Sequence, residues 1–421
     1  MPAREMTLLS VQAAQARVLS HFQPVEAETL PLDRCVGRVL AAAVISSDLP
    51  LFDNSSVDGF AVIASDVATA SAAKPCRLEV VADIPAGFPS SIAVHPGQAA
   101  RIMTGAPLPQ GADAVVMVED TDFDNRGAGT PAPSHVKALK PVRSGENVRT
   151  RGMDVRMGEK VLLAGQRLRP QDIGMLAMLG VATATVFRKP RVALLSSGDE
   201  LAAVEGPLEP GKIRDTNSYT LSALMLESGS EVISLGIAPD QREAIKALFD
   251  RGVDLGADLI VSSAGVSVGA LDFIREVVES EGKLDFWRVN MRPGKPLAFG
   301  EYRGVPFVGL PGNPVSAFVG FEVFVRPALG RLAGNAAFRG SGGLTGRPRV
   351  RVRLEQAIES DGRESYLRAV VQEREGSWSA RLTGHQGSGN LLSLVQANAL
   401  LIIPAGVKSL AIGAQVDAWL L

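Results

Sequence analysis

The chain has 421 residues, more than one ordinary hydrophobic core holds, and at about 150 residues per domain this length indicates roughly three domains. Its hydrophobic content of 46% and charged content of 21% are typical of a globular protein and exclude a disordered one. The 43 lysines and arginines nearly balance the 45 acidic residues, so the net charge is −2. This balance argues against nucleic acid or a membrane surface as a partner, because both attract a basic excess, but it allows a local pocket for a small anion.

Cysteine and histidine usage excludes two further classes. The two cysteines, Cys35 and Cys76, cannot form a disulfide framework, and we interpret both as small buried hydrophobic residues. The 4 histidines are scattered and match no metal-binding spacing, so a zinc site is not expected. Residues 1–10 lack the apolar core of a signal peptide, and no apolar run is long enough to cross a bilayer. We therefore expect a soluble, cytoplasmic protein with no membrane partner.

The first elements in the chain are a helix and a set of short strands. A helix is predicted over residues 10–19, with Ser10 as its N-cap and apolar residues on one face. A turn-rich stretch, residues 49–62, then leads into short strands separated by proline and glycine. We interpret residues 50–143 as a small β module, in which the polar stretch 121–134 forms a loop or hairpin tip.

A second helix follows the β module. It begins at Pro170, since proline is tolerated at the first helical position, and Gly180 is its expected stop. We group this helix with the first one in a connecting module that comprises residues 1–30 and 144–185.

From Arg191 onward the pattern changes to an α/β domain. Continuous apolar runs alternate with helical stretches, and such runs are typical of strands that are buried on both faces. The runs are residues 192–195, 232–235, 259–261 and 307–310. We predict a doubly wound, mainly parallel α/β domain over residues 31–49 and 186–330. Sheets of this kind bind ligands beyond the carboxyl ends of their strands.

The last part of the chain is predicted to be all β. After a glycine-rich linker, residues 330–346, the arginines at 347, 349, 351 and 353 alternate with apolar residues. Alternation with a period of two indicates a strand with one charged face. We predict a C-terminal β-barrel-like domain over residues 335–421.

Small and polar residues follow three of the strands of the α/β domain. The stretches are 196–200 (SSGDE), 262–269 (SSAGVSVG) and 311–316 (PGNPVS). Glycine lets the backbone approach a ligand, and amides at a helix start bind anionic oxygens. Because the carboxyl ends of parallel strands meet at one sheet edge, the three loops together predict a phosphate site.

One of these loops also fits a different chemistry. Residues 265–269 match the GxSxG nucleophile elbow of serine hydrolases, in a strand–turn–helix context. A hydrolase requires a later histidine, and His385 alone follows, in the separate β module. The loop is neither a Walker A motif nor GxGxxG. The hydrolase therefore remains a remote alternative.

Charged residues at turns extend the phosphate hypothesis. Asp58, Glu200, Asp240 and Asp272 lie at turns or strand ends, and such carboxylates together with phosphate oxygens are a typical Mg²⁺ environment. In the stretch 287–296, proline and glycine fix a turn that carries Arg292 and Lys295, which favours binding of an oxyanion.

Seven motifs, taken together and in order, resemble the molybdopterin molybdenumtransferase family, which includes bacterial MoeA and the E domain of gephyrin. They are residues 53–62 (DNSSVDGFAV), 101–106 (RIMTGA), 198–201 (GDEL), 215–218 (DTNS), 265–269 (GVSVG), 292–296 (RPGKP) and 310–316 (LPGNPVS). The resemblance implies insertion of molybdate into adenylylated molybdopterin, with Mg²⁺-assisted release of AMP, to give molybdenum cofactor. It also implies an elongated homodimer in which the α/β domain of one subunit and the last β module of its mate form the cleft. Molybdopterin adenylyltransferase and molybdoenzymes are implied as further partners.

The resemblance implies roles for individual residues as well. The catalytic residues that line the cleft would be Asp58, Thr104, Asp154, Glu200, Asp240 and Asp272. Adenylylated molybdopterin would contact Gly198, Asp215, Asn217, Gly265, Ser267, Gly269, Gly312, Asn313 and Pro314. Molybdate would bind Arg292, Lys295, Pro296, Ser316, Arg368 and Ser388, and Mg²⁺ would bind Asp240 and Asp272.

The sequence departs from the family in four places. Arg288 and Arg292 stand where lysine is usual, Ala264 replaces a common glycine, and Ala270 replaces an acid beside Asp272. Two further alternatives stay open. One is a molybdopterin adenylyltransferase, whose fold resembles the α/β domain alone; the extra modules argue against it. The other is a gephyrin-like scaffold, against which the retained acids and basic turn argue.

Overall fold

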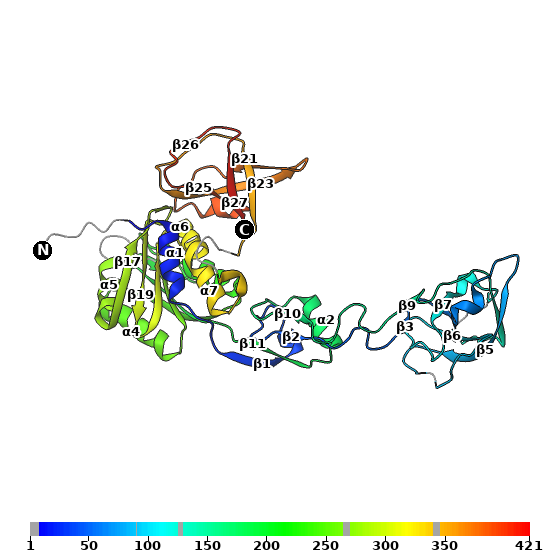
Figure 1. Cartoon of the computed structure of the whole chain (residues 1–421). Helices are drawn as coiled ribbons and strands as arrows, with labels where there is room; N and C mark the ends of the chain where they lie inside the picture. The colour runs from blue at the N-terminus through cyan, green and yellow to red at the C-terminus, as the bar shows by residue number, and fades with distance from the viewer. Residues whose placement is uncertain (1–7, 90, 125–128, 264–269, 340–345) are drawn as a thin grey trace. The chain divides into compact units, whose positions relative to one another are not determined.

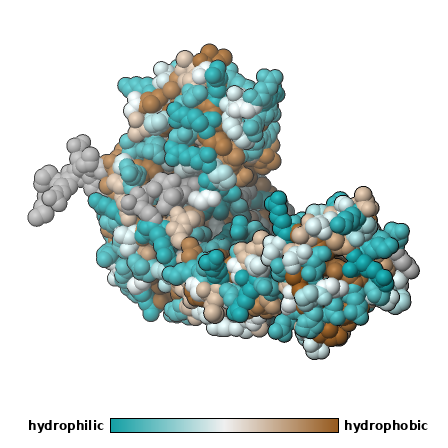
Figure 2. Space-filling view, turned by 45° about the vertical axis from the view of Figure 1, so that its right-hand side comes forward, coloured by the Kyte–Doolittle hydropathy of each residue, from teal (hydrophilic) through white to brown (hydrophobic). Residues whose placement is uncertain are grey.

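The computed structural model describes residues 8–89, 91–124, 129–263, 270–339 and 346–421 (Figure 1). The chain forms two compact units, one of residues 43–163 and one that combines residues 1–42 with 164–421. Among the described residues, no helix has the length and apolar character required to cross a membrane. The face shown in Figure 2 is mainly hydrophilic, with apolar patches that are small and separate.

The smaller unit is built on a five-stranded sheet with the strand order β7-β4-β6-β5-β8. Strand β4 is buried on both faces, because Phe60 and Val62 pack into one hydrophobic cluster and Ala61 into another. The strands are β4 (Gly59–Val62), β5 (Cys76–Ile84), β6 (Gln98–Ile102), β7 (Ala114–Met117) and β8 (His135–Ala138). Short turns η2 (Ala64–Val67) and η3 (Val118–Asp120) flank the sheet, and two ladders pair β2 (Val44–Ile45) with β10 (Lys160–Leu162) and β3 (Asn54–Ser55) with β9 (Val148–Arg149).

The α/β domain confirms the prediction of a doubly wound, mainly parallel sheet. Its strand order is β15-β12-β16-β20-β19-β17, and only β19 runs antiparallel to its neighbours. Because β15 and β16 lie on opposite sides of β12, the strand order reverses at β12, where such folds bind ligands. The strands are β12 (Arg191–Ser197), β15 (Glu231–Ala238), β16 (Leu259–Ser263), β17 (Gly282–Arg288), β19 (Pro296–Tyr302) and β20 (Val305–Leu310), with a small pair β13 (Leu201–Ala202) and β14 (Ile213–Arg214) beside them.

Helices cover both faces of this sheet (Figure 1). One hydrophobic cluster joins the sheet to helices α1, α3, α6 and α7, and a second joins the other face to α4 and α5. The helices are α1 (Val11–Ser20), α3 (Asn217–Glu227), α4 (Arg242–Asp254), α5 (Ala270–Glu281), α6 (Pro314–Gly320) and α7 (Arg326–Leu332), with a π-helical turn η4 (Phe321–Val325) between the last two.

The predicted domain boundaries differ from the structure in three places. Helix α1, which we assigned to the connecting module, packs Val18 and Leu19 into the core of the α/β domain instead. The stretch 31–49, which we assigned to the α/β domain, runs beside the connecting strands, where Leu40 pairs with Val186. Residues 144–163, which we assigned to the connecting module, belong to the smaller unit. For helix α1 the apolar face was read correctly from the sequence, but its partner depends on tertiary packing.

The connecting segment itself is a small antiparallel pair with one helix. Strand β1 (Ala27–Pro31) pairs with β11 (Thr183–Phe187), and helix α2 (Pro170–Met178) starts at a proline as predicted. The short turn η1 (Leu32–Arg34) follows β1, and η5 (Ala336–Phe338) follows α7.

The C-terminal domain is the predicted β barrel. Its sheet has the order β23-β24-β21-β27-β25 and closes through pairing of β25 with β23, while β18 (Met291–Arg292) of the α/β domain adds to β23 in parallel. Val352 and Leu354 point into the core and Arg349 and Arg351 point outward, which confirms the predicted charged face. The remaining elements are β21 (Arg349–Leu354), β22 (Ile358–Glu359), β23 (Glu364–Arg374), β24 (Ser377–Leu382), α8 (Leu391–Val395), β25 (Ala399–Ile403), β26 (Ser409–Leu410) and β27 (Gln415–Leu420).

Candidate functional site

A pocket of about 640 Å³ lies at the carboxyl ends of the parallel strands. Many of its lining residues belong to the predicted site, and they come from the loops after β12 and β20 and from the start of α3. These residues are Glu200, Asp215, Asn217, Pro296, Gly312, Asn313, Pro314 and Ser316. Gly389 and Leu391 of the C-terminal domain complete the lining. The structure therefore brings together strand-end loops, part of the basic turn and the final module of the same chain.

Asn217 holds two of these loops in register. Its Nδ2 donates to the Ser263 hydroxyl at 2.8 Å and to the Gly312 carbonyl at 2.7 Å. Its Oδ1 is buried and has no hydrogen-bond partner among the residues that the structure describes. Beside it, Asp215 caps helix α3, since its carboxylate accepts from the Ser218 amide at 3.1 Å and from the Ser218 hydroxyl at 2.5 Å. Asn217 thus fixes the ends of β16 and β20 at the pocket, and Asp215 fixes the start of α3 beside them.

A group of carboxylates lies at the ends of β12 and β15. The Asp240 amide donates to Asp199 Oδ1 at 3.1 Å, and Asp240 Oδ1 is buried with no partner in the described part of the chain. Burial raises the pKa of the Asp240 carboxyl above its ordinary value, and the nearby charges of Asp199 and Glu200 raise it further. Gly198 has φ = 152°, a backbone conformation that residues with a side chain rarely adopt, so a glycine suits this position beside Glu200.

Mg²⁺ fits this group only as part of a larger ligand set. In the described part of the chain, no three His, Cys, Asp or Glu side chains are arranged to hold a metal ion. Mg²⁺ commonly takes one or two carboxylates together with phosphate oxygens, and the unpartnered Asp240 oxygen suits that mode. Asp272 lies in the first turn of α5.

The basic turn is held by both neighbouring domains. The Val289 amide donates to the Lys295 carbonyl at 3.0 Å, which closes the turn around the cis bond before Pro293. Arg292 and Lys295 are exposed, and Arg292 Nη1 lies 3.7 Å from Asp361 Oδ2. Since β18 pairs with β23 of the barrel, the turn is fixed at the junction of the two domains.

Arg368 lies next to this turn but does not line the pocket. Its side chain is 0% exposed, with Nε donating to Ser393 Oγ at 3.0 Å and Nη2 to the Gly387 carbonyl at 2.9 Å. Burial, with a smaller effect from the charge of Arg292, lowers the pKa of Arg368 to about 10. A buried cation next to a second cation favours a bound anion.

The expectation that Arg368 and Ser388 of a partner subunit complete the pocket stays a prediction, and the same chain also brings its own Ser388 loop to this edge. Within one chain, the Val315 amide donates to the Ser388 carbonyl at 3.0 Å, and Gly389 lines the pocket. The pairing of β18 with β23 places the barrel of the same chain at this edge.

Three predicted catalytic residues belong to the smaller unit. Asp58 Oδ1 accepts from the Thr104 amide at 2.7 Å and from its hydroxyl at 2.8 Å, so these two predicted residues contact each other. Asp154 pairs with Arg149. Because Asp58 and Thr104 are far apart in the sequence, the sequence did not indicate that these two residues contact each other.

Other predicted features lie outside the described residues. They are Gly265, Ser267 and Gly269, with Ala264, so both the phosphate loop and the nucleophile elbow remain predictions there. Sequence reasoning missed Asp199, Gln386 and Ser393, all of which contact predicted residues. Asp199 adjoins Glu200 within a recognised loop and was available from the sequence, whereas no spacing pattern marks Gln386 or Ser393.

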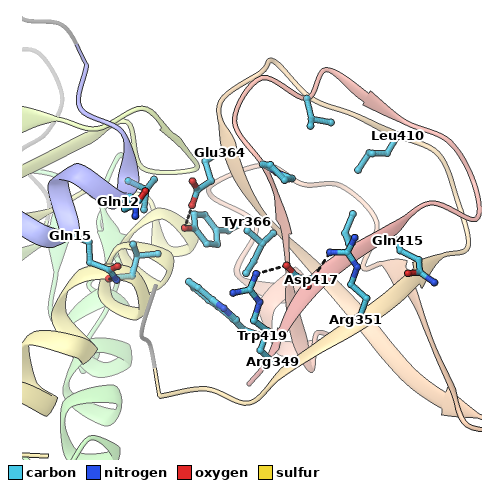
Figure 3. A pocket seen from close by; sticks show the side chains of 16 residues that line it. Gln12, Gln15, Arg349, Arg351, Glu364, Tyr366, Leu410, Gln415, Asp417 and Trp419 are labelled. Atoms are coloured by element: carbon cyan, nitrogen blue, oxygen red, sulfur yellow. Dashed lines mark hydrogen bonds and ion pairs between the residues drawn. The ribbon is translucent and has the colours of Figure 1, made fainter. Parts of the chain in front are cut away.

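A second groove, of about 470 Å³, shares no lining residue with this pocket. Figure 3 shows Gln12 and Gln15 of α1 on one side and Tyr366 and Trp419 of the barrel on the other. Its charged side chains satisfy one another: Arg351 Nη1 lies 3.2 Å from Asp417 Oδ1 and Arg349 pairs with the same carboxylate, while Glu364 accepts from the Tyr366 hydroxyl at 2.5 Å. The groove therefore presents no free charge to specify a ligand.

The fold and the pocket define a multidomain protein with a pocket at the carboxyl ends of the strands of an α/β domain. Family models agree along the chain: the MoeA N-terminal region (domains I and II) matches residues 9–180, a probable molybdopterin binding domain matches residues 193–331, and the MoeA C-terminal region (domain IV) matches residues 351–421.

Comparison with known proteins gives the same result over the full length. Molybdopterin molybdenumtransferase of Nostoc sp. is 38% identical over 93% of this chain and 88% of its own length. Molybdopterin molybdenumtransferase 2 of Mycobacterium tuberculosis is 38% identical over 97% and 99%. The crystal structure of the molybdopterin biosynthesis MoeA protein from Pyrococcus horikoshii OT3 is 31% identical, with a TM-score of 0.81 over 99% of this chain and 100% of that one. The chain belongs to the molybdopterin molybdenumtransferase family, as the motifs indicated.

Proposed function

We propose that this enzyme inserts molybdate into adenylylated molybdopterin and releases AMP, in a reaction that depends on Mg²⁺. The observation that carries the proposal is the single pocket that joins the strand-end loops, through Asn217 and Gly312, to Pro296 and Ser316 beside the basic turn. A pterin phosphate at the loops and an oxyanion at the turn would then be neighbours.

The strand-end loops would bind the phosphates of the pterin. Backbone amides and the start of helix α3 can bind anionic oxygens. The two hydrogen bonds of Asn217 hold the end of β16 and the loop after β20 at a fixed distance from each other. Asp240 and Asp272 would hold Mg²⁺, which supplies charge neutralisation at the phosphates. The raised pKa of Asp240 supports this role, because a nearby cation relieves its repulsion from Asp199 and Glu200.

The basic turn would bind molybdate. A dianion leaves water only for a pocket of several fixed positive donors. Arg292 and Lys295 are exposed on a closed turn, and buried Arg368 adds a third positive charge behind them. Ser316 and the Ser388 loop lie at the same edge and offer hydroxyl donors.

We also propose that the enzyme works in the cytoplasm as a homodimer, with molybdopterin adenylyltransferase and molybdoenzymes as successive partners. The family resemblance motivates these partners. Support for a subunit contact comes from exposed apolar side chains gathered near the ends of the smaller unit, Leu51, Phe52, Met153 and Met157.

The test is incubation of the purified protein with adenylylated molybdopterin, molybdate and Mg²⁺. We expect AMP release that requires both molybdate and Mg²⁺, and absence of the molybdate dependence would refute the proposal. Incubation with ATP and molybdopterin tests the adenylyltransferase alternative, for which we expect no product. Labelling of Ser267 by a fluorophosphonate would instead support the hydrolase.

A further inference from the structure

Arg368 carries a buried charge that no described carboxylate balances. It is 0% exposed, and its guanidinium uses a serine hydroxyl and a backbone carbonyl as acceptors. An arginine side chain has five N–H donors, so donors remain for a further ligand. Such a charge is unfavourable in isolation and must be held in place by its surroundings.

The backbone of Arg368 is held by a side chain as well as by neighbouring main chain. On one side β23 pairs with β25 at Leu400, and the ladder with β24 begins at the next residue, Ala369. Beyond the end of β24 the Thr383 amide donates to the Arg368 carbonyl at 3.1 Å, whereas the Arg368 amide is held by Gln386. Its Oε1 accepts from the Arg368 amide at 2.9 Å, and its Nε2 donates to the Arg368 carbonyl at 3.1 Å. Gln386 thereby fastens the loop 384–390 to β23.

The side chain of Arg368 is held by the other end of the same loop. Ser393 is fully buried, and its hydroxyl accepts from Arg368 Nε while donating to the Asn390 carbonyl at 2.6 Å. The Gly387 carbonyl accepts from Nη2. Arginine and loop therefore form one hydrogen-bonded unit, and this unit reaches the pocket through Ser388, whose carbonyl accepts from Val315, and through Gly389.

We propose that Gln386 and Ser393 are positioning residues of the oxyanion pocket, which set how closely the Arg368 charge and the Ser388 loop approach bound molybdate. The proposal rests on the proposed function. Because Arg368 lies beneath the loop, its charge acts on the cleft at a distance that the loop determines. Neither positioning residue lines the pocket, so the pterin half of the site should not sense their loss.

The test is a comparison of Gln386→Ala and Ser393→Ala with the wild-type enzyme in steady-state AMP release. Ser393→Ala removes a hydrogen bond to the charged guanidinium, and Gln386→Ala removes two hydrogen bonds to the Arg368 backbone. In each variant we expect the KM for molybdate to rise by about tenfold. The KM for adenylylated molybdopterin, and kcat at saturating molybdate, should stay within about twofold. Ser379→Ala, in the same barrel but bonded to Glu355, is the matched control and should behave as wild type. A parallel rise of both KM values, or the same change in the control, would overturn the proposal.

Amide hydrogen exchange provides a readout that does not need activity. In Gln386→Ala the Arg368 amide should exchange faster, while the Val371 amide, which donates to Asn398, should keep its rate. An unchanged Arg368 amide would refute the clamp. If wild-type enzyme released no AMP in response to molybdate, the proposed function would fail, and the exchange experiment would still decide on the clamp.

Discussion

Replacing Asp240 by asparagine should stabilise the fold while it weakens the response to Mg²⁺. In the wild-type protein the Asp240 Oδ1 is buried without a partner, and Asp199 and Glu200 repel its charge. A buried polar group without a hydrogen bond costs about 1–3 kcal/mol. Asparagine keeps the shape and removes the charge, but its amide oxygen stays buried, so we expect a gain of about 1 kcal/mol at neutral pH.

The pH dependence separates this explanation from a general packing effect. The pKa of Asp240 is raised in the folded state, so the folded state holds this proton more tightly than the unfolded chain. The stability that this bound proton contributes to the folded state is fully present below the ordinary carboxyl pKa, and it is lost as the pH rises through the folded-state pKa. The increase in the free energy of unfolding that Asp240→Asn causes should therefore be small at acidic pH and largest at neutral pH.

The assay is urea unfolding of both proteins at pH 7.5 and at the lowest pH at which both remain folded. Asp33→Asn, at an exposed position, serves as the control and should change little. In parallel, the Mg²⁺ concentration for half-maximal AMP release should rise in Asp240→Asn. The reasoning would be refuted if Asp240→Asn were less stable than wild type at pH 7.5. It would also be refuted if the free energy of unfolding changed by the same amount at both pH values.

Three further substitutions test other contacts. Asn217→Ala removes both hydrogen bonds of the loop clamp. In steady-state kinetics it should raise the KM for adenylylated molybdopterin about tenfold and leave the KM for molybdate unchanged. An equal rise of both KM values would contradict this expectation. Glu322→Ala leaves two arginines without their 0%-exposed carboxylate and should lower the free energy of unfolding by about 3–5 kcal/mol in urea titrations, so a loss below about 1 kcal/mol would count against it. Asp58→Ala should speed hydrogen exchange of the Thr104 amide, and an unchanged rate would mean that this bond is absent in solution.

The fold was largely predictable because its signals are local. The run 192–195 is apolar without interruption, and a strand buried on both faces is the usual cause of such a run. Helix α1 was predicted at its correct place as well. Its partner was not, because an amphipathic pattern shows that a face is buried but not which surface covers it.

The site was predictable only where its residues lie in strand-end loops. Glu200 and Gly312 follow strands β12 and β20 of one sheet, and the sheet brings their loops together. Asp215 and Asn217 instead follow the separate strand β14 and were found through the motif 215–218. The contact of Gln386 with Arg368 joins two parts of a barrel through a side chain that holds the backbone beyond the end of β24, and no sequence period records such a contact. The same holds for Val315 and Ser388, whose contact depends on how two domains meet.

The short ladder between β18 and β23 also bears on the order in which the enzyme is assembled. It joins Arg292 to Ser365, so the turn gains its barrel partner only after a long stretch of chain has been added. Closing a loop of that length is entropically unfavourable until both ends belong to folded parts. During synthesis from the N-terminus the α/β domain can fold first, and the barrel follows. A nascent chain can therefore complete the strand-end loops of the pocket before Gly389 and Leu391 of the barrel are added to its lining, and the two parts of the pocket meet only when translation is nearly complete.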